Sequence, residues 1–304
     1  QIEGRRDLSL KHLPEWTAYR KCGSACFPVE ASRGCRYSCS FCSYPERGAQ
    51  AYRPIESVIN EILLLAGAQG AKYIRFVDTN LTSDPAYVAD LCGRLERERL
   101  TIPWSCFARA DELAANGDMC KRMADAGCFW VYSGVESADE EILARMGKGF
   151  GRREIEMGIS NVKAAGMAFH GNFVIGFPGE TEATVRRAHE MITGSGMDTV
   201  SLTVLGITDA MAALAEKEPA KFSHMSRHGH QWKHSTMDFE SARRAAADLV
   251  GQIARGTGSP IIVSHGIAMY YLLGGGIDFA GVIDYFSAIR DYHRAKINGN
   301  AGAL

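Results

Sequence analysis

The chain has 304 residues, a formal net charge of −1 and 46% hydrophobic residues. The hydrophobic fraction is enough to build a core. The length suits one large α/β domain with an appendage, or two domains. The near-zero net charge gives no electrostatic reason to expect nucleic acid as a partner. No apolar run approaches the roughly 20 residues of a membrane span, and no signal peptide is visible. Nine cysteines are an odd number, which favours a reducing compartment, the cytoplasm, over a disulfide framework.

Strands and helices are expected to alternate through the first two thirds of the chain. The pattern predicts strands at residues 28–32, 71–78, 102–108, 128–135, 167–175 and 199–205. It predicts helices at residues 55–66, 84–99, 111–126, 138–146, 152–165 and 180–194. Repeated βα units imply parallel strands with right-handed crossovers. Six units fit an incomplete (β/α)6 barrel, although an open doubly wound sheet would give the same pattern.

The alternation is expected to stop near residue 206. Helices are predicted at residues 207–217, 238–255, 260–273 and 278–296. We therefore expect three parts: a lead-in over residues 1–27, a core barrel over 28–205, and a helical C-terminal extension over 206–304 that forms a cap or annex on the barrel.

Three cysteines follow the first predicted strand at the spacing C-x3-C-x2-C: Cys35, Cys39 and Cys42, with the aromatic Phe41 just before the third. Cysteine thiolates are the usual ligands of iron–sulfur clusters. Three ligands for a four-iron cluster leave one iron open to a substrate or cofactor, as an open position does on catalytic zinc. A zinc knuckle or chance clustering is the alternative. Zinc sites normally close with four ligands, and no partner Cys or His lies just downstream of Cys42.

The spacing and the aromatic residue resemble the radical S-adenosylmethionine (SAM) enzymes, whose fold is a partial (β/α)6 barrel similar to a TIM barrel. The resemblance implies that Cys35, Cys39 and Cys42 hold a [4Fe-4S] cluster. It also implies that the open iron chelates the amino and carboxylate groups of the SAM methionine moiety. One electron then cleaves the sulfonium and gives a 5′-deoxyadenosyl radical. The end of the first barrel strand is where such a fold collects catalytic groups.

Two segments near the fourth predicted strand extend the resemblance. Residues 134–137, Gly-Val-Glu-Ser, resemble the G-I/V-E-S segment of many radical SAM enzymes, which implies that Glu136 and Ser137 face the SAM ribose or methionine part. Residues 145–148 match the basic segment that follows it. Arg145 is a candidate for binding the SAM carboxylate. The alternative is a solvated helix C-terminus, where a cation is favoured in any case.

The fifth predicted strand runs into Asn172-Phe-Val-Ile-Gly-Phe-Pro-Gly-Glu-Thr, which resembles the G-x-P-G-E-T segment of the superfamily. Glycine permits close backbone approach, and Pro178 stiffens the bend. The resemblance makes Asn172, Ile175 and Gly176 candidate cofactor-binding residues, with the backbone near Ile175 reading the adenine edge. A plain strand–turn–helix connection would use similar residues.

Two further polar groups follow predicted strands. Residues 76–82 lack the Gly-Gly-Glu type segment of many radical SAM enzymes and resemble the F-x-D-x-N/D-F pattern of the cobalamin-binding and methylthiotransferase-like branches. Asp78 is therefore a candidate acceptor for the SAM ammonium, or else a helix-capping residue. Arg109 has a planar fork that suits a carboxylate or phosphate, and its alternative is a surface pair with Asp111.

Other cysteines and histidines leave alternatives open. Cys22 and Cys26 could ligate a second metal, or be small apolar fillers. Cys106 could quench a substrate radical, or pack in the core. Four histidines cluster in the C-terminal part of the chain: His224, His228, His230 and His234, with Trp232 among them. They suggest either a metal site or a polar loop over the barrel mouth.

A segment of the C-terminal extension adds to the resemblance. Residues 232–238 resemble a W-x-H-x-T-M segment in some cobalamin-associated members. Asp238 and Ser235 are candidate caps of the following helix.

The resemblance covers roughly residues 28–205 and implies a methyltransferase of the cobalamin-associated branch, acting on an unactivated carbon or phosphorus centre of a small molecule. A small electron donor such as a flavodoxin would supply the reductant. Residues 4–16 resemble the linker after a cobalamin-binding domain. Either the chain is cut from a longer protein or this member works without cobalamin. No catalytic acid or base is assigned.

Other functions stay open. Within the resemblance, the alternatives are methylthiolation of RNA or protein, which the helical extension disfavours, and radical cyclisation. A non-catalytic iron–sulfur or zinc module is an alternative of another class. The sixfold alternation disfavours that module.

Overall fold

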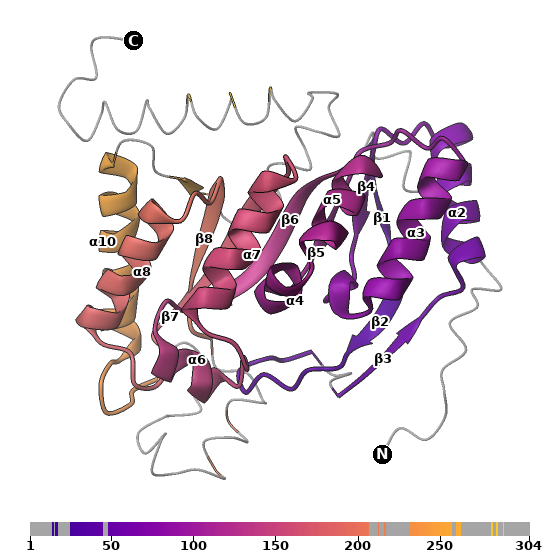
Figure 1. Ribbon diagram of the computed structural model, residues 1–304. Helices are drawn as coiled ribbons and strands as arrows, with labels where there is room; N and C mark the ends of the chain where they lie inside the picture. The colour runs from indigo at the N-terminus through magenta and orange to yellow at the C-terminus, as the bar shows by residue number, and fades with distance from the viewer. Residues whose placement is uncertain are drawn as a thin grey trace.

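The computed structural model describes residues 25–44, 48–206, 232–256 and 260–262, together with isolated positions elsewhere. Within these residues, seven parallel strands form one open sheet in the order β1-β4-β5-β6-β7-β8-β9 (Figure 1). The strands are β1 (Cys26–Val29), β4 (Tyr73–Phe76), β5 (Trp104–Phe107), β6 (Cys128–Glu136), β7 (Ala168–Ile175), β8 (Thr199–Val204) and β9 (Ile261–Ile262). A separate antiparallel ribbon pairs β2 (Ser32–Cys35) with β3 (Ala49–Tyr52).

Helices connect the strands and cover one side of the sheet (Figure 1). They are α2 (Ile55–Gly67), the short 3-10 helix η1 (Leu81–Ser83), α3 (Pro85–Arg97), α4 (Ala110–Ala115), α5 (Gly117–Asp125), α6 (Glu140–Met146), α7 (Arg152–Ala164), α8 (Glu182–Gly194) and α10 (Phe239–Arg255). The start of α3 follows the predicted signal, because the Asp84 side chain accepts hydrogen bonds from two amides of the first turn and Pro85 follows it.

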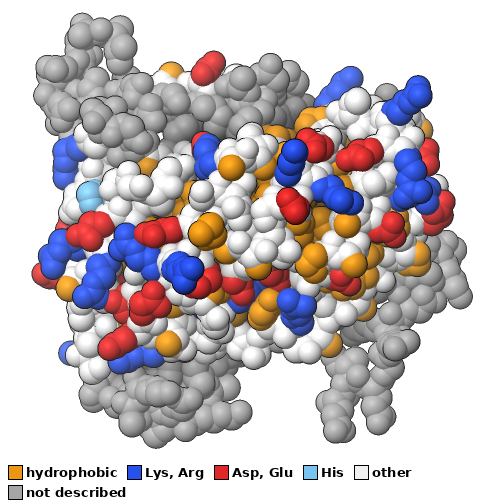
Figure 2. Space-filling view, viewed as in Figure 1, with side chains coloured by type: hydrophobic (Ala, Val, Ile, Leu, Met, Phe, Trp, Pro, Cys, Tyr) orange, Lys and Arg blue, Asp and Glu red, His pale blue; other side chains and the backbone are white. Residues whose placement is uncertain are grey.

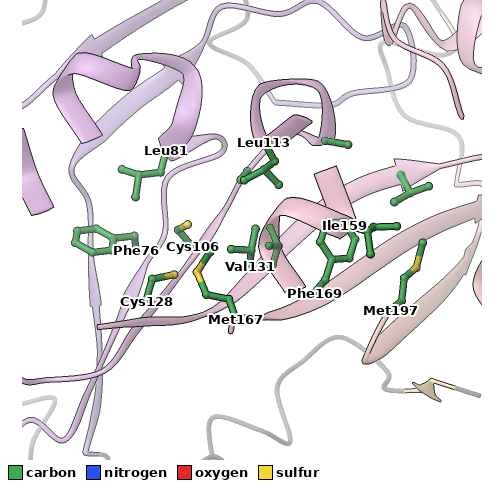
Figure 3. Packing of buried hydrophobic residues seen from close by; sticks show 14 of the residues in the cluster. Phe76, Leu81, Cys106, Leu113, Cys128, Val131, Ile159, Met167, Phe169 and Met197 are labelled. Carbon is green, nitrogen blue, oxygen red and sulfur yellow. The ribbon is translucent and has the colours of Figure 1, made fainter. Parts of the chain in front are cut away.

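The main core lies between the sheet and these helices. Side chains alternate across a strand, so Ile74 and Phe76 of β4 face the helices together with Val131 of β6 and Phe169 of β7. Cys106 also points into this core, where its sulfur lies near that of Cys128 (Figure 3). Cys106 is therefore a packing residue, and not a thiol facing the barrel mouth.

Three predicted boundaries are wrong, each for a local reason. The strand expected at residues 28–32 is split, because the chain turns after β1 and residue 32 begins the ribbon. The helix expected at 111–126 breaks at Asn116 (φ −137°, ψ 71°), where asparagine and the following glycine both favour non-helical backbone. The helix expected at 260–273 starts instead as β9, whose β-branched isoleucines pair with β8. The βα alternation thus continues past residue 206.

Acidic and basic side chains are interspersed over the face that Figure 2 shows. Several form ion pairs within or between helices, such as Arg94 with Glu56 and Arg152 with Glu156. Among the helices that the structure describes, none has the length and apolar character needed to cross a membrane. The predicted helices at 207–217 and 278–296 lie almost wholly outside the described residues.

Candidate active site

The cysteine loop is enclosed by the β2–β3 ribbon, directly after β1. Cys35 ends β2, and the amide of Gly48 donates a hydrogen bond to its carbonyl at 2.7 Å, which closes the loop at its base. Gly34 has φ +94°, and a Cβ there would overlap the carbonyl oxygen of Ala49. Only glycine fits both the backbone conformation and the space, so the residue before the first cysteine is fixed by the ribbon.

The middle of the loop is held by the C-terminus of α6. Ser40 donates from its amide to the carbonyl of Met146 at 2.9 Å and from its hydroxyl to the carbonyl of Arg145 at 3.1 Å. The last carbonyls of a helix have no partner within the helix. Gly147 ends α6 in the left-handed conformation that commonly terminates helices. The cysteine loop therefore satisfies groups that α6 leaves open, and α6 positions the loop in return.

The three cysteines are half-buried and none of them is in a disulfide. The amide of Cys42 donates to the carbonyl of Cys39 at 3.2 Å, and the amide of Tyr44 donates to the sulfur of Cys42 at 3.4 Å. Burial raises the pKa of the Cys35 thiol. Amide donors near a sulfur favour its thiolate form, which is the form that binds metals.

Over the described part of the chain, no three Cys, His, Asp or Glu side chains converge to hold a single metal ion. A four-iron cluster bonds each thiolate to a different iron, so its ligands do not meet at one point. The donor set of three half-buried thiols is one short of the four ligands of a closed zinc site, and it fits a four-iron cluster with one iron left open.

Arg109 lies against the cysteine loop. Its guanidinium stacks 3.5 Å from the ring centre of Tyr37, and one of its nitrogens is 4.0 Å from the sulfur of Cys39. The side chain also forms an ion pair with Asp111 at 3.0 Å and donates to the carbonyl of Lys148 at 2.5 Å. The pair with Asp111 that the sequence suggested is present, but it is not a surface pair: Arg109 is 8% exposed. It places a positive charge beside the second cysteine.

Glu112, in the first turn of α4, is a buried acceptor shared by two other segments. Its carboxylate accepts hydrogen bonds from the Tyr37 hydroxyl at 2.6 Å, from the Asn80 amide at 3.0 Å and from the Thr82 hydroxyl at 2.7 Å. Its role could not be predicted from the sequence, because acidic residues are common in the first turn of a helix, where they interact favourably with the helix dipole. It joins the cysteine loop to the segment after β4.

Glu136 ends β6 with φ +65°, an uncommon backbone conformation for a residue other than glycine. Its buried carboxylate lies 3.5 Å from the ammonium of Lys148. Burial raises the pKa of Glu136, and the Lys148 charge opposes that effect. The same ammonium is 5.9 Å from the ring centre of Phe41, so this pair lies next to the aromatic residue before Cys42.

Ser137 precedes α6, and Arg145 lies in its last turn. The Ser137 hydroxyl accepts a hydrogen bond from the Asp139 amide at 3.2 Å. The guanidinium of Arg145 is partly exposed and lies 3.8 Å from Glu141. It also covers the turn after β7, since a Cβ on Gly179 would be 2.6 Å from it. The solvated helix end that the sequence offered as an alternative is present, and binding of a SAM carboxylate stays a prediction.

Asp78 is buried, with 1% of its surface exposed. Its carboxylate accepts hydrogen bonds from the Ala31 amide at 3.0 Å and the Ser32 hydroxyl at 2.5 Å. Burial raises its pKa to about 6. The helix-cap alternative is wrong, because η1 and α3 begin after Asn80 and Asp84. Asp78 fixes the turn between β1 and β2, and a contact with the SAM ammonium stays a prediction.

Asn172 belongs to a hydrogen-bonded row on the sheet face away from the main core. Its amide nitrogen donates to the Ser133 carbonyl at 3.3 Å, and its oxygen accepts from the Ser201 hydroxyl at 2.7 Å. His170 reaches the same oxygen at 3.2 Å and the Thr199 hydroxyl at 2.8 Å. Burial lowers the pKa of His170 to about 4, so this ring is neutral at pH 7.

The turn after β7 is tightly bonded. The Ile175 side chain is buried in the core, and its carbonyl accepts from the Leu205 amide at 2.8 Å. The Gly176 amide donates to the carboxylate of Glu180, a buried residue whose pKa burial raises to about 7. Phe177 packs edge-on against Phe41, with ring centres 6.5 Å apart. The predicted adenine-binding segment therefore contacts the cysteine loop.

Some of the remaining sequence candidates lie within the described residues and others do not. Cys22 and the histidines at 224, 228 and 230 lie outside the described residues. Cys26 is buried in β1, and burial raises its pKa to about 12, as expected of an apolar filler. Asp238 caps α10, accepting from the Ser241 amide at 2.8 Å, whereas Ser235 does not cap it.

The sequence model of the radical SAM superfamily matches residues 29–192, which include the cysteine loop and the turn after β7. Since the match covers more than half of the chain, the chain belongs to this superfamily. The expected α/β fold with a parallel sheet of the radical SAM type is thereby confirmed.

Sequence relatives include three enzymes. The chain is 34% identical to an uncharacterized methyltransferase of Pyrococcus horikoshii over 54% of this chain. It is 28% identical to the bacteriochlorophyllide d C-12(1)-methyltransferase of Chlorobaculum tepidum over 56%. It is 29% identical to the tRNA-2-methylthio-N(6)-dimethylallyladenosine synthase of Bordetella petrii over 64%. The matched regions cover 36%, 38% and 43% of these relatives, so the chain spans less than half of their length.

Solved structures share the fold. The methyltransferase TsrM from Kitasatospora setae, with cobalamin and a [4Fe-4S] cluster bound, aligns over 98% of this chain and 66% of its own, with a TM-score of 0.67 and 18% identity. The cobalamin-dependent radical SAM enzyme OxsB aligns over 89% and 50%, with a TM-score of 0.62 and 14% identity. At these identities, the likeness is one of fold.

Proposed function

We propose that Cys35, Cys39 and Cys42 hold a [4Fe-4S] cluster and that the chain binds and reductively cleaves SAM. The observation that carries this proposal is the loop of three thiols, which is one ligand short of a closed set and is held between the β2–β3 ribbon and α6. When bound, the cluster supplies one electron that splits the C5′–S bond of the sulfonium into methionine and a 5′-deoxyadenosyl radical.

The chain's own residues support this chemistry by position and charge. Arg109 places a guanidinium beside Cys39 and offsets the negative charge of a thiolate set. Glu136 and Lys148 form a buried pair next to Phe41. We assign Glu136, Ser137, Arg145, Asn172, Ile175, Gly176 and Asp78 to the SAM side of the site as predictions from the family resemblance.

We infer further that the reaction is methyl transfer to an unactivated carbon or phosphorus centre of a small molecule, with cobalamin as the methyl carrier. The methyltransferase names of the first two relatives and the likeness in fold to cobalamin-bound TsrM support this. No described residue is assigned to cobalamin. The proposal includes a small electron donor such as a flavodoxin and a cytoplasmic setting.

Methylthiolation is the second candidate. The Bordetella relative, a tRNA methylthio synthase, matches a larger share of this chain than either methyltransferase does. The two reactions differ in what they transfer: a methyl group alone, or a methyl group with sulfur.

The test is anaerobic reconstitution with iron and sulfide, followed by reduction and addition of SAM. We expect a [4Fe-4S] electron paramagnetic resonance signal that changes when SAM is added and is lost in Cys39→Ala but kept in the control Cys120→Ala. With cobalamin added, methyl transfer predicts formation of S-adenosylhomocysteine. A protein that binds zinc in place of iron, or a cluster indifferent to SAM, would contradict the proposal.

A further inference from the structure

A hairpin from the C-terminal part of the chain packs on the turn after β7. Residues 232–238 form this hairpin, which we call the Trp232 hairpin. It is closed by hydrogen bonds from the His234 amide to the Met237 carbonyl and from the Phe239 amide to the Trp232 carbonyl, each 2.9 Å long. It runs directly into α10, which Asp238 caps. The hairpin is thus a built element anchored at its exit.

Two side chains of the hairpin hold both ends of the turn 176–179. His234 Nε2 contacts the carbonyl oxygen of Gly176 at 3.0 Å. A carbonyl can only accept, so Nε2 carries the proton and Nδ1 is the acceptor. The Thr236 hydroxyl lies 3.1 Å from Nδ1 and accepts from the Gly179 amide at 3.2 Å. The turn is thereby enclosed in one ring of hydrogen bonds.

Trp232 extends this clamp to the neighbouring strand. Its indole nitrogen donates to the carbonyl of Leu205, just past the end of β8, at 2.7 Å. The indole stacks on the His234 ring, with centres 5.1 Å apart and planes 9° apart. Both side chains are at most 2% exposed. One stacked pair thus bonds to the carboxyl ends of both β7 and β8, and sets the spacing between them.

The clamp is in contact with the cysteine loop through one residue. Phe177, inside the enclosed turn, packs against Phe41 beside Cys42. A shift of the turn would therefore move the aromatic contact that relates β7 to the cysteines.

We propose that the Trp232 hairpin is a positioning element of the SAM site, which holds the ends of β7 and β8 in register with the cysteine loop so that the adenosyl part of SAM is placed correctly. The inference rests on the proposed function. His234, Thr236 and Trp232 are positioning residues, because they act through the backbone of the turn and of Leu205.

The test compares Thr236→Val, His234→Ala and His234→Gln with the exposed control Ser235→Ala, each in the reconstituted 304-residue chain. Thr236 is exposed and valine keeps its shape, so this variant should fold. SAM affinity is measured by equilibrium dialysis. The cluster signal with methionine alone, which lacks the adenosyl part, is recorded beside it.

We expect His234→Ala and Thr236→Val to weaken SAM binding by about fivefold or more, the loss of one or two hydrogen bonds, while iron content and the response to methionine stay unchanged. His234→Gln should recover most of the affinity, because its amide can donate to Gly176. SAM affinity within about twofold of the unsubstituted chain in both variants would overturn the inference alone. Failure of the unsubstituted chain to bind SAM would contradict the proposed function and this inference together.

Discussion

At the scale of single residues, the site depends on buried charges that each serve more than one segment. Glu112 accepts from the cysteine loop and from two residues after β4. Arg109 contacts Tyr37, Cys39 and the Lys148 carbonyl. Because such groups are costly to leave unpaired in a protein interior, their partners hold one another in place. The cysteine loop is ordered by these side chains as well as by its backbone.

Replacing Glu112 with alanine should destabilise the protein by about 2–4 kcal/mol, since it removes the acceptor of the Tyr37, Asn80 and Thr82 donors and the ion-pair partner of Arg36. We expect a lower melting temperature and reduced iron retention after reconstitution. The control is Glu96→Ala, an exposed glutamate of α3. Equal melting temperatures and iron contents for the two variants would contradict the role assigned to Glu112.

Replacing Arg109 with alanine should lower the reduction potential of the reconstituted cluster, on the order of tens of millivolts, because a positive charge beside a ligand favours the reduced form. Arg109→Lys should keep part of the effect, without the planar stacking on Tyr37. Redox titration followed by electron paramagnetic resonance measures both, with the exposed Arg122→Ala as control. A potential unchanged in Arg109→Ala would refute this electrostatic role.

Because of Glu180, the free energy of unfolding should fall as pH rises. Burial raises its pKa in the folded chain to about 7, above the roughly 4.3 of an unfolded glutamate. The folded state therefore binds the proton more tightly. Its stabilising contribution is present below about pH 4.3 and is lost as pH rises through about 7, by at most about 1.4 kcal/mol per pH unit.

Glu180→Gln should remove this slope between about pH 5 and 7, and the exposed Glu182→Gln should not. Unfolding free energies from denaturant titrations across this range measure the difference. Parallel pH profiles for the unsubstituted chain and Glu180→Gln would contradict the assignment.

At the scale of elements, the turn after β7 leaves no space for a side chain at Gly176. Gly176 has φ +97°, and a Cβ there would lie 2.5 Å from the Trp232 ring and 2.8 Å from the Ala242 Cβ. Gly149 also has a positive φ, +71°, but has nothing within 4 Å of the same position. Comparing substitutions at the two glycines therefore separates the cost of a positive φ from the cost of steric overlap.

Gly176→Ala should therefore cost clearly more than Gly149→Ala. We expect about 1 kcal/mol for the second, from strain alone, and about 2–4 kcal/mol for the first, where a buried overlap is added. Chemical denaturation measures both. Equal costs would show that the Trp232 hairpin yields without penalty, and would weaken its assignment as a rigid clamp.

Local signals explain why most elements could be predicted and why others could not. Asp84 before Pro85 predicted the start of α3 from adjacent residues alone. The split after β1 depends on Asp78, which lies 47 residues from Ala31 in the sequence. The contact of Glu112 with Tyr37 spans 75 residues. Neither has a local signature, because the energy comes from a tertiary hydrogen bond.

The same distinction applies to the candidate site. The cysteines and the segments after β6 and β7 could be found because their chemistry is written in short motifs. The Lys148 ammonium could not be paired with Glu136, since nothing local brings a lysine beyond α6 back to the end of β6. Residues 232–238 resemble a short motif, yet the hairpin that they form and its contact with Gly176 appear only in the fold.

At the scale of the whole molecule, the carboxyl ends of β1, β6 and β7 meet around one loop. The β2–β3 ribbon and the end of α6 hold the cysteine loop, the turn after β7 contacts it through Phe177, and a hairpin from the far end of the chain holds that turn. Hydrogen bonds and one aromatic contact thus join the cysteine loop, the turn after β7 and the Trp232 hairpin in a single region. This arrangement is what a cofactor spanning several strand ends requires.

We propose that this region cleaves SAM by one-electron reduction. Chromatographic detection of 5′-deoxyadenosine, from the reconstituted, reduced chain incubated with SAM under anaerobic conditions, tests this proposal. We expect 5′-deoxyadenosine to form, Cys39→Ala to abolish it, and Cys120→Ala to leave it unchanged. Absence of 5′-deoxyadenosine from a chain that carries a reduced [4Fe-4S] cluster and binds SAM would contradict it.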